Sequence, residues 1–296
     1  NFTGQFSSDG LANLRFGQAQ VDRSRHSVSE VCLYEETPDL STRGSLTLFE
    51  SLRSRMIDSE GDVIIFIHGF NVSFKNALVA ASRLRERYQP AGAPTVNVVA
   101  FSWPSDGKAT YYRSDQLDAQ ISGYAFMRGI QKLLKFLHSI NSENVCKRDI
   151  HLVAHSMGNF VLRHTLQQML NENPGRQPRL FEQVILAAAD EDNDAFEHDI
   201  MLARLPELAR RVSIYANRND RALTISDWTK GNPDRLGSDG PRLPMYLPPK
   251  VTVVDCTPVV FGALEHAYYV ESERVVQDIV ETLSGKPSHQ INGREF

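Results

Sequence analysis

The chain has 296 residues, enough for one large domain with a sizeable core. Hydrophobic residues make up 41% of it and charged residues 23%, near the average for a soluble globular protein. The 32 basic and 36 acidic side chains give a net charge of −4, so no basic excess points to nucleic acid. The longest apolar runs have the length of a strand, far below the roughly 20 residues of a transmembrane segment.

The first 45 residues are polar and predict an N-terminal extension with one or two strands, at residues 14–21 and near residues 31–34. Residues 1–10 lack the apolar stretch of a signal peptide, so we expect a cytoplasmic location. The chain does not begin with Met, which leaves a processed N-terminus and a periplasmic or envelope location open.

Strands alternate with helices over residues 46–284, where we expect the main domain. We expect strands at residues 63–68, 96–102, 149–154, 184–189, 212–216 and 251–254. We expect helices at residues 45–56, 75–88, 124–140, 158–170 and 273–283, and in part of residues 194–210. Strands that are apolar throughout are typical of a sheet covered on both faces. The pattern predicts an α/β fold with a doubly wound, mostly parallel sheet and helices on both faces, which binds ligands at the carboxyl ends of its strands.

Two segments depart from this alternation. Residues 221–250 are rich in glycine and proline, and a loop of that length is usually functional or disordered, so we expect an insertion that serves as a lid or pocket wall. Residues 285–296 predict a disordered or loosely attached tail.

The strongest motif is a serine at a strand–helix junction. Residues 151–166 read HLVAHSMGNFVLRHTL, an apolar strand that runs into an apolar helix. Ala154 and Gly158 are small residues two before and two after Ser156, as a nucleophile elbow requires. The turn places the serine at a helix N-terminus, where the amide of Met157 points at a developing oxyanion. The alternative is an ordinary turn with an incidental serine.

A second oxyanion donor is expected from residues 63–71, VIIFIHGFN, where a buried strand ends in His68-Gly69. The candidate is the backbone N–H of Phe70, with Asn71 next in line, because Gly69 permits the turn that aims it. His68 precedes this turn, so we expect it to pack in the loop rather than act as a base.

A serine nucleophile needs a histidine to take its proton and a carboxylate to orient that histidine. In hydrolases with this elbow the chain order is serine, acid, histidine, and the histidine follows the last strand, which selects His266. The acid should follow the strand before it, which favours Asp220. Asp190 or Asp192, after the preceding strand, and Asp255, at the end of the last strand, stay open as alternatives.

Aromatic residues near these strand ends are candidates for substrate binding. Trp103 follows a strand in FSWPSDG and offers a rigid apolar surface, with packing under the loop as the favoured alternative. Trp228 and Tyr246 lie in the 221–250 segment and Asn71 in the oxyanion loop. The three cysteines form no metal-like cluster, and we expect no metal.

These landmarks together resemble the bacterial esterase/lipase-like α/β hydrolases of largely uncharacterised function. The matching segments, which span about 205 residues, are IFIHGFNVSFKNAL (65–78), FSWPSDG (101–107), HLVAHSMGNFVLR (151–163), ILAAADEDNDAF (185–196), YANRNDRAL (215–223), RLG (235–237) and LEHAYYV (264–270). The chain departs from that family at ILAAADED, where the family more often has a proline before the aspartate. The resemblance implies an intracellular or envelope hydrolase with a triad of Ser156, Asp220 and His266 and no cofactor.

The combined expectation is a serine hydrolase that cleaves a small-molecule or lipid-like ester through an acyl-enzyme. A lipase or phospholipase, and an acyltransferase or amidase, would use the same parts. A non-catalytic binding or signalling module on the same fold is the alternative from another class. The sequence specifies neither the substrate nor the oligomeric state.

Overall fold

The computed structural model describes residues 14–35, 43–89, 92, 94–105, 111–141, 146–223, 234–261 and 266–294. Its main sheet comprises β3 (Val63–Ile67), β4 (Asn97–Phe101), β5 (Ile150–His155), β6 (Phe181–Ala187), β7 (Ala209–Ala216) and β8 (Val251–Asp255). These strands lie in the order β4-β3-β5-β6-β7-β8, and every neighbouring pair is parallel. The predicted parallel α/β sheet is therefore confirmed.

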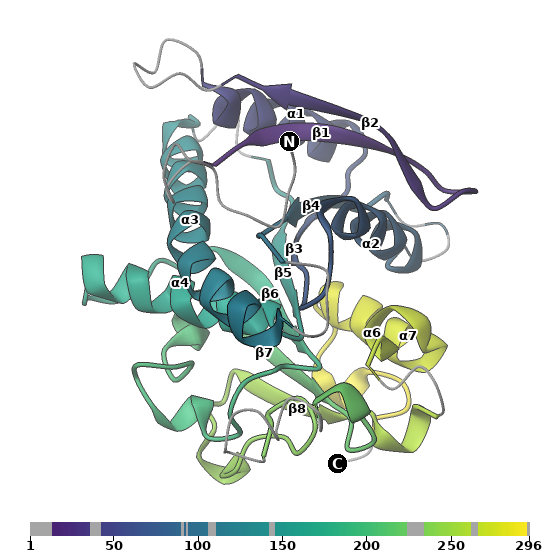
Figure 1. The fold of residues 1–296 in the computed structure, drawn as a ribbon, viewed down its shortest axis with the longest axis vertical. Coiled ribbons are helices and arrows are strands. Elements are labelled where there is room, and N and C mark those ends of the chain that lie inside the picture. Colours follow the sequence, from purple (N-terminus) through teal and green to yellow (C-terminus); the bar gives the residue numbers. More distant parts are fainter. Residues whose placement is uncertain are drawn as a thin grey trace.

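Helices cover both faces of this sheet (Figure 1). One face carries α1 (Gly44–Asp58), α3 (Tyr112–Ser139) and α4 (Gly158–Glu172), and the other carries α2 (Phe74–Arg87), α6 (Tyr268–Glu271) and α7 (Glu273–Leu283). Strand β3 shows why the sequence folds this way. Its five apolar residues are all buried, with Val63 and Ile65 in the core under α1 and α3, and Ile64 and Phe66 in the core under α2 and α6.

The N-terminal region forms a separate hairpin of β1 (Phe16–Asp22) and β2 (Ser27–Tyr34), which pair antiparallel. The two predicted strands are therefore present. The hairpin packs against α1 and α2 rather than adding a strand to the edge of the main sheet at β4.

Two predicted helices differ from those observed. Helix α3 begins at Tyr112 instead of residue 124, because its polar first turns are anchored by the buried Asp115, which accepts a hydrogen bond from Ser105. Residues 194–210, which were predicted to be helical in part, form no α-helix. That segment holds only two 3₁₀ turns, η3 (Ala195–Glu197) and η4 (Leu205–Glu207), before β7 begins. Pro206 lacks the N–H that would continue a helix.

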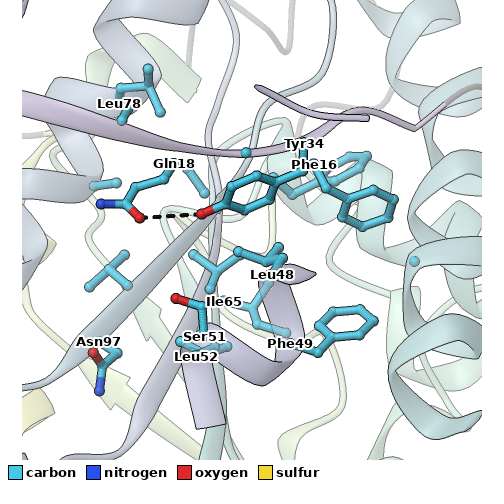
Figure 2. A pocket seen from close by; sticks show the side chains of 18 of the residues that line it. Phe16, Gln18, Tyr34, Leu48, Phe49, Ser51, Leu52, Ile65, Leu78 and Asn97 are labelled. Carbon is cyan, nitrogen blue, oxygen red and sulfur yellow. Dashed lines mark hydrogen bonds between the residues drawn. The ribbon is translucent and has the colours of Figure 1, made fainter. Parts of the chain in front are cut away.

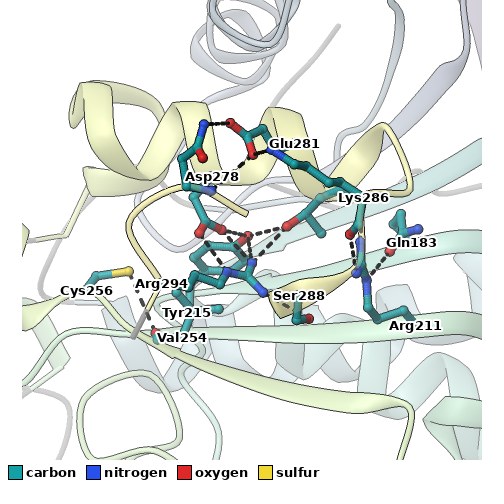
Figure 3. Close-up of polar contacts among 12 residues, drawn as sticks. Gln183, Arg211, Tyr215, Val254, Cys256, Asp278, Glu281, Lys286, Ser288 and Arg294 are labelled. Carbon is teal, nitrogen blue, oxygen red and sulfur yellow. Dashed lines mark hydrogen bonds and ion pairs between the residues drawn. The ribbon is translucent and has the colours of Figure 1, made fainter. Parts of the chain in front are cut away.

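The C-terminal segment is attached along its described length, so the predicted disorder is wrong for residues 285–294 (Figure 3). The buried Arg294 guanidinium lies 2.6 Å from the Asp278 carboxylate of α7 and 2.9 Å from the Thr282 hydroxyl. Asp278 also accepts from the Tyr215 hydroxyl of β7 at 2.6 Å. The ion pair and these hydrogen bonds fix the segment against α7 and the sheet. Among the helices in the described ranges, none is long and apolar enough to cross a membrane.

Candidate active site at the carboxyl edge of the sheet

Ser156 occupies a tight turn between β5 and α4. Its φ of +53° is in the left-handed region, which a non-glycine residue adopts at a cost. The turn is held by the buried Asn159, whose side-chain amide donates to the carbonyls of Ala154 at 3.2 Å and Ser156 at 3.0 Å. At Gly158 a Cβ would lie 2.6 Å from the Ile67 carbonyl oxygen, so only glycine lets the helix approach the end of β3. The sequence therefore builds a strained, closely packed elbow around this serine.

The loop after β3 lies directly against the serine. A Cβ on Gly69 would come within 2.8 Å of the Ser156 Cβ. The backbone amides of Phe70 and Met157 donate a hydrogen bond to no residue within the described ranges, so both can donate to a ligand oxygen. Asn71 is exposed and also has a positive φ, +59°.

His68 and Trp103 hold this loop from below and are buried. Trp103 donates its indole N–H to the His68 carbonyl at 2.8 Å and its backbone N–H to the His68 ring at 3.2 Å. The two rings stack with centroids 5.2 Å apart. Burial lowers the pKa of His68 to about 4, so the ring is neutral at pH 7. Trp103 is only 3% exposed, so it supports the loop and presents no open surface to a substrate. This agrees with packing under the loop, the alternative that the sequence favoured over substrate binding.

His266 and Asp220 meet at the same edge although 46 residues separate them in the chain. The His266 Nδ1 lies 2.8 Å from one Asp220 carboxylate oxygen and 3.0 Å from the other. Asp220 is fully buried and accepts further hydrogen bonds from the backbone amides of Ala222 and Leu223. The two backbone amides fix the orientation of the carboxylate, so that both of its oxygens lie near the imidazole of His266. The Ser156 hydroxyl makes no hydrogen bond to His266 among the described residues, and such contacts often tighten only when substrate is bound.

His155 contributes a contact that the sequence analysis did not single out. Its Nε2 lies 3.1 Å from the His266 carbonyl oxygen, and its ring stacks on Tyr269 with centroids 4.4 Å apart. Burial, and secondarily the charge of His266, place the pKa of His155 well below its usual value, so it is neutral and its N–H donates. Because His155 immediately precedes Ser156, this bond holds His266 beside the elbow. Its position in the AHSMG motif was the available signal.

The alternative acids are used elsewhere in the structure. The buried Asp190 accepts a hydrogen bond from the Tyr112 hydroxyl, and the Arg235 guanidinium lies between Asp190 and Asp192. The Asp255 carboxylate caps a turn by accepting from the Thr257 amide at 2.9 Å. Since Nδ1 of His266 faces Asp220, none of the three alternatives takes the place beside the histidine.

Comparisons with known proteins agree with this architecture. The profile of the family described as "Alpha/beta hydrolase of unknown function (DUF900)" matches residues 47–283. The chain belongs to this family of α/β hydrolases. A curated relative, the uncharacterised protein alr1448 of Nostoc sp. (strain PCC 7120 / SAG 25.82 / UTEX 2576), is 26% identical over 186 residues. The match covers 54% of this hydrolase and 45% of the Nostoc protein, so the chain spans about half the length of that relative.

The solved structures to which the chain is similar are distant in sequence. A lipase-esterase related protein from Clostridium acetobutylicum ATCC 824 has 12% identity and a TM-score of 0.38, covering 76% of this hydrolase and 94% of that chain. A cutinase-like protein from Cryptococcus sp. has 14% identity and a TM-score of 0.39, covering 76% and 93%.

A polar cavity of about 550 Å³ adjoins the elbow of this hydrolase. It is connected to the serine turn through Asp190, whose backbone N–H donates to the Ser156 carbonyl at 3.3 Å. Tyr112, another wall residue, contacts the Phe70 ring edge-to-face at 5.3 Å. The cavity walls carry three arginines and three carboxylates: Arg113, Arg163, Arg235, Asp190, Glu191 and Asp192.

The predicted lid and its aromatic residues are only partly covered by the structure. Trp228 lies outside the described residues. Tyr246, on η5 (Pro244–Tyr246), is 75% exposed and does not line the polar cavity. At Gly237 a Cβ would clash with the Ala189 nitrogen at 2.2 Å, so residues 234–240 pack tightly on the end of β6. This half of the segment is a fixed wall and not a lid. Within the described ranges no cluster of His, Cys, Asp and Glu side chains could hold a metal ion.

Proposed function

We propose that this α/β hydrolase is a serine hydrolase that cleaves carboxylic esters through an acyl-enzyme. Ser156 Oγ attacks the ester carbonyl carbon while His266 takes the hydroxyl proton. The C–O bond to the alcohol then breaks, and His266 returns the proton to the departing alcohol oxygen. A water molecule, deprotonated by the same histidine, hydrolyses the acyl-serine and releases the acid.

The observation that carries this proposal is the bond between His266 Nδ1 and the buried Asp220 carboxylate, next to a serine held in a left-handed turn. A carboxylate at Nδ1 fixes the tautomer whose Nε2 is free to accept a proton, and it stabilises the imidazolium that forms. The amides of Phe70 and Met157 are the proposed oxyanion donors. These features support a catalytic rather than a purely binding role for the fold.

The polar cavity beside the elbow indicates the size and polarity of the ester that the site would accept. Long acyl chains bind in predominantly apolar pockets, whereas this cavity carries three arginines and three carboxylates. We therefore propose a small or polar ester in preference to a long-chain lipid. A lipase or phospholipase, an acyltransferase and an amidase would use the same catalytic residues, but the charged walls of this cavity do not favour the lipid-directed activities.

A fluorophosphonate probe tests the nucleophile, because it reacts covalently with activated serines. We expect labelling of the native protein, loss of labelling in Ser156→Ala, and unchanged labelling in Ser24→Ala, a serine on the exposed hairpin turn. Equal labelling of native protein and Ser156→Ala would contradict the proposal. No labelling at all would favour the non-catalytic alternative.

A panel of p-nitrophenyl esters from acetate to palmitate tests the substrate class. We expect the highest kcat/KM on the short esters. A preference for palmitate would leave Ser156 as nucleophile but would overturn the assignment of the polar cavity to the substrate.

A further inference from the structure

A second cavity, of about 530 Å³, lies between the β1–β2 hairpin and the main sheet (Figure 2). Its walls come from the hairpin, α1, α2, α3, β3 and β4. It exists because the hairpin packs on α1 and α2 without pairing with β4, the edge strand, which leaves a space over that edge. Its volume is in the range of roughly 300–1,000 Å³ that small-molecule pockets occupy.

One side of the cavity is apolar. Phe16 of β1 and Phe49 of α1 contact each other edge-to-face at 6.1 Å, and Leu48, Leu52 and Ile65 continue the surface beside them. In Figure 2 the rings of Phe16 and Phe49 lie to one side of the cavity, and the polar Gln18 and Asn97 lie to the other. The Tyr34 ring lies between them and donates its hydroxyl to Gln18 at 3.3 Å. The apolar side fits an unbranched hydrocarbon chain, which needs apolar contact along its whole length.

The mouth of the cavity carries a cluster of arginines. Four exposed arginines line it: Arg15, Arg23, Arg55 and Arg85. Arg55 and Arg85 have no carboxylate within ion-pair distance among the described residues, whereas Arg23 pairs with Glu86. Gln18 orients Arg55 by accepting a hydrogen bond from its Nη2 at 2.6 Å. Burial, followed by the nearby charges of Arg23 and Arg55, lowers the pKa of Arg85. A bound anion would offset these positive charges.

We propose that this cavity binds a single-chain amphiphilic carboxylate, such as a free fatty acid. The carboxylate lies at the mouth with Arg55 and Arg85, and the chain extends toward Phe16 and Phe49. Asn97 and the arginines stand near the amino ends of β3 and β4, at the edge of the sheet opposite Ser156. The site is therefore separate from the proposed catalytic centre and does not depend on its activity.

Displacement of a dansyl-labelled undecanoate by unlabelled compounds tests the site on the full chain. We expect saturable binding of one equivalent, displaced by dodecanoate below its micelle concentration, with dodecanol about tenfold weaker and acetate ineffective. Binding should be equal in Ser156→Ala and in native protein pretreated with a fluorophosphonate, since the catalytic edge is not involved. Loss of binding in either would overturn the proposal, as would equal affinity for dodecanol.

Variants separate the two ends of the cavity. Arg85→Met keeps the apolar stem and removes the charge, and we expect it to weaken dodecanoate about tenfold while leaving dodecanol unchanged. Leu78→Trp places an indole in the cavity and should weaken both compounds. Arg25→Met is the matched control, because Arg25 is an exposed hairpin arginine that does not line the cavity. Unchanged dodecanoate binding in Arg85→Met, or equal weakening in Arg25→Met, would contradict the role assigned to the mouth.

Discussion

Two neighbouring strands at the carboxyl edge of the sheet are each followed by carboxylates, and the two sets are used differently. After β7, Asp220 receives the ring N–H of His266 and two backbone amides. After β6, Asp190 and Asp192 receive the guanidinium of Arg235. Both Asp190 and Asp220 are buried, so burial does not distinguish them. The two carboxylates differ in the hydrogen-bond donor that faces them, which is the His266 ring for Asp220 and the Arg235 guanidinium for Asp190.

The donor at the end of β6 is delivered by close backbone packing. Gly237 approaches Ala189 too closely for any side chain, and its N–H donates to the Ala189 carbonyl at 2.9 Å. This contact places Arg235, two residues earlier, under the carboxylates that follow β6. At the end of β7, the Asp220 carboxylate faces the Nδ1 of His266 instead. Asp220 is therefore the candidate catalytic acid because its partner is a histidine, whereas the partner of Asp190 is an arginine.

The largest expected effect comes from removing the charge of Asp220. Asp220→Asn keeps the shape but favours the wrong tautomer of His266, so we expect kcat/KM for p-nitrophenyl acetate to fall by roughly 10³–10⁴. Asp255→Asn should leave kcat/KM within about twofold, since Asp255 caps an exposed turn. A tenfold or smaller loss in Asp220→Asn would break the distinction between the two strand ends, especially if Asp190→Asn lost more.

The second effect concerns stability at the end of β6. Arg235→Met removes the buried guanidinium that lies between Asp190 and Asp192, and we expect the free energy of unfolding to fall by about 3–5 kcal/mol. Chemical denaturation followed by circular dichroism measures it. Arg210→Met, which removes an exposed ion pair with Glu182, should cost less than about 1 kcal/mol. Similar losses in the two variants would show that Arg235 is not a structural cation.

The same comparison explains what the sequence could predict. Strand β3 and the Ser156 turn are encoded by contiguous residues, apolar ones for burial on both faces and small ones around the serine, so both were predicted. The order of strands brought Asp220 and His266 to one edge. Arg235 was not foreseen as buried, because its partners follow a different strand. The polar start of α3 was missed for a similar reason, since Asp115 is satisfied by the distant Ser105.

Two histidines at this edge, His266 and His68, also differ in the groups that they contact. His266 has an anionic partner, whereas His68 contacts only neutral groups and its pKa is lowered to about 4. Below pH 6.5 His68 takes up a proton in the unfolded chain but not in the folded protein. The free energy of unfolding therefore decreases as the pH is lowered from 6.5 to about 4. At about 1.4 kcal/mol per pH unit, this histidine accounts for about 3 kcal/mol.

Urea titrations at several pH values between 6.5 and 5 measure that slope. His155 and His164, whose pKa values are also lowered by burial, add to it in the same direction. His68→Gln should be less stable than native protein at pH 7.5 and should show a shallower pH dependence. Identical slopes in native protein and His68→Gln would mean that His68 is not the neutral, buried group described.

The smallest expected effect comes from His155, which we expect to position His266 without taking part in the reaction. His155→Phe keeps the stack on Tyr269 but removes the hydrogen bond to the His266 carbonyl, so we expect kcat to fall about tenfold with KM unchanged. His155→Gln can place an amide N–H near the former Nε2 and should recover most of that loss. If Gln were no better than Phe at equal unfolding free energy, the bond would not be holding His266 beside Ser156. Retained activity in both would mean that Asp220 alone orients the histidine.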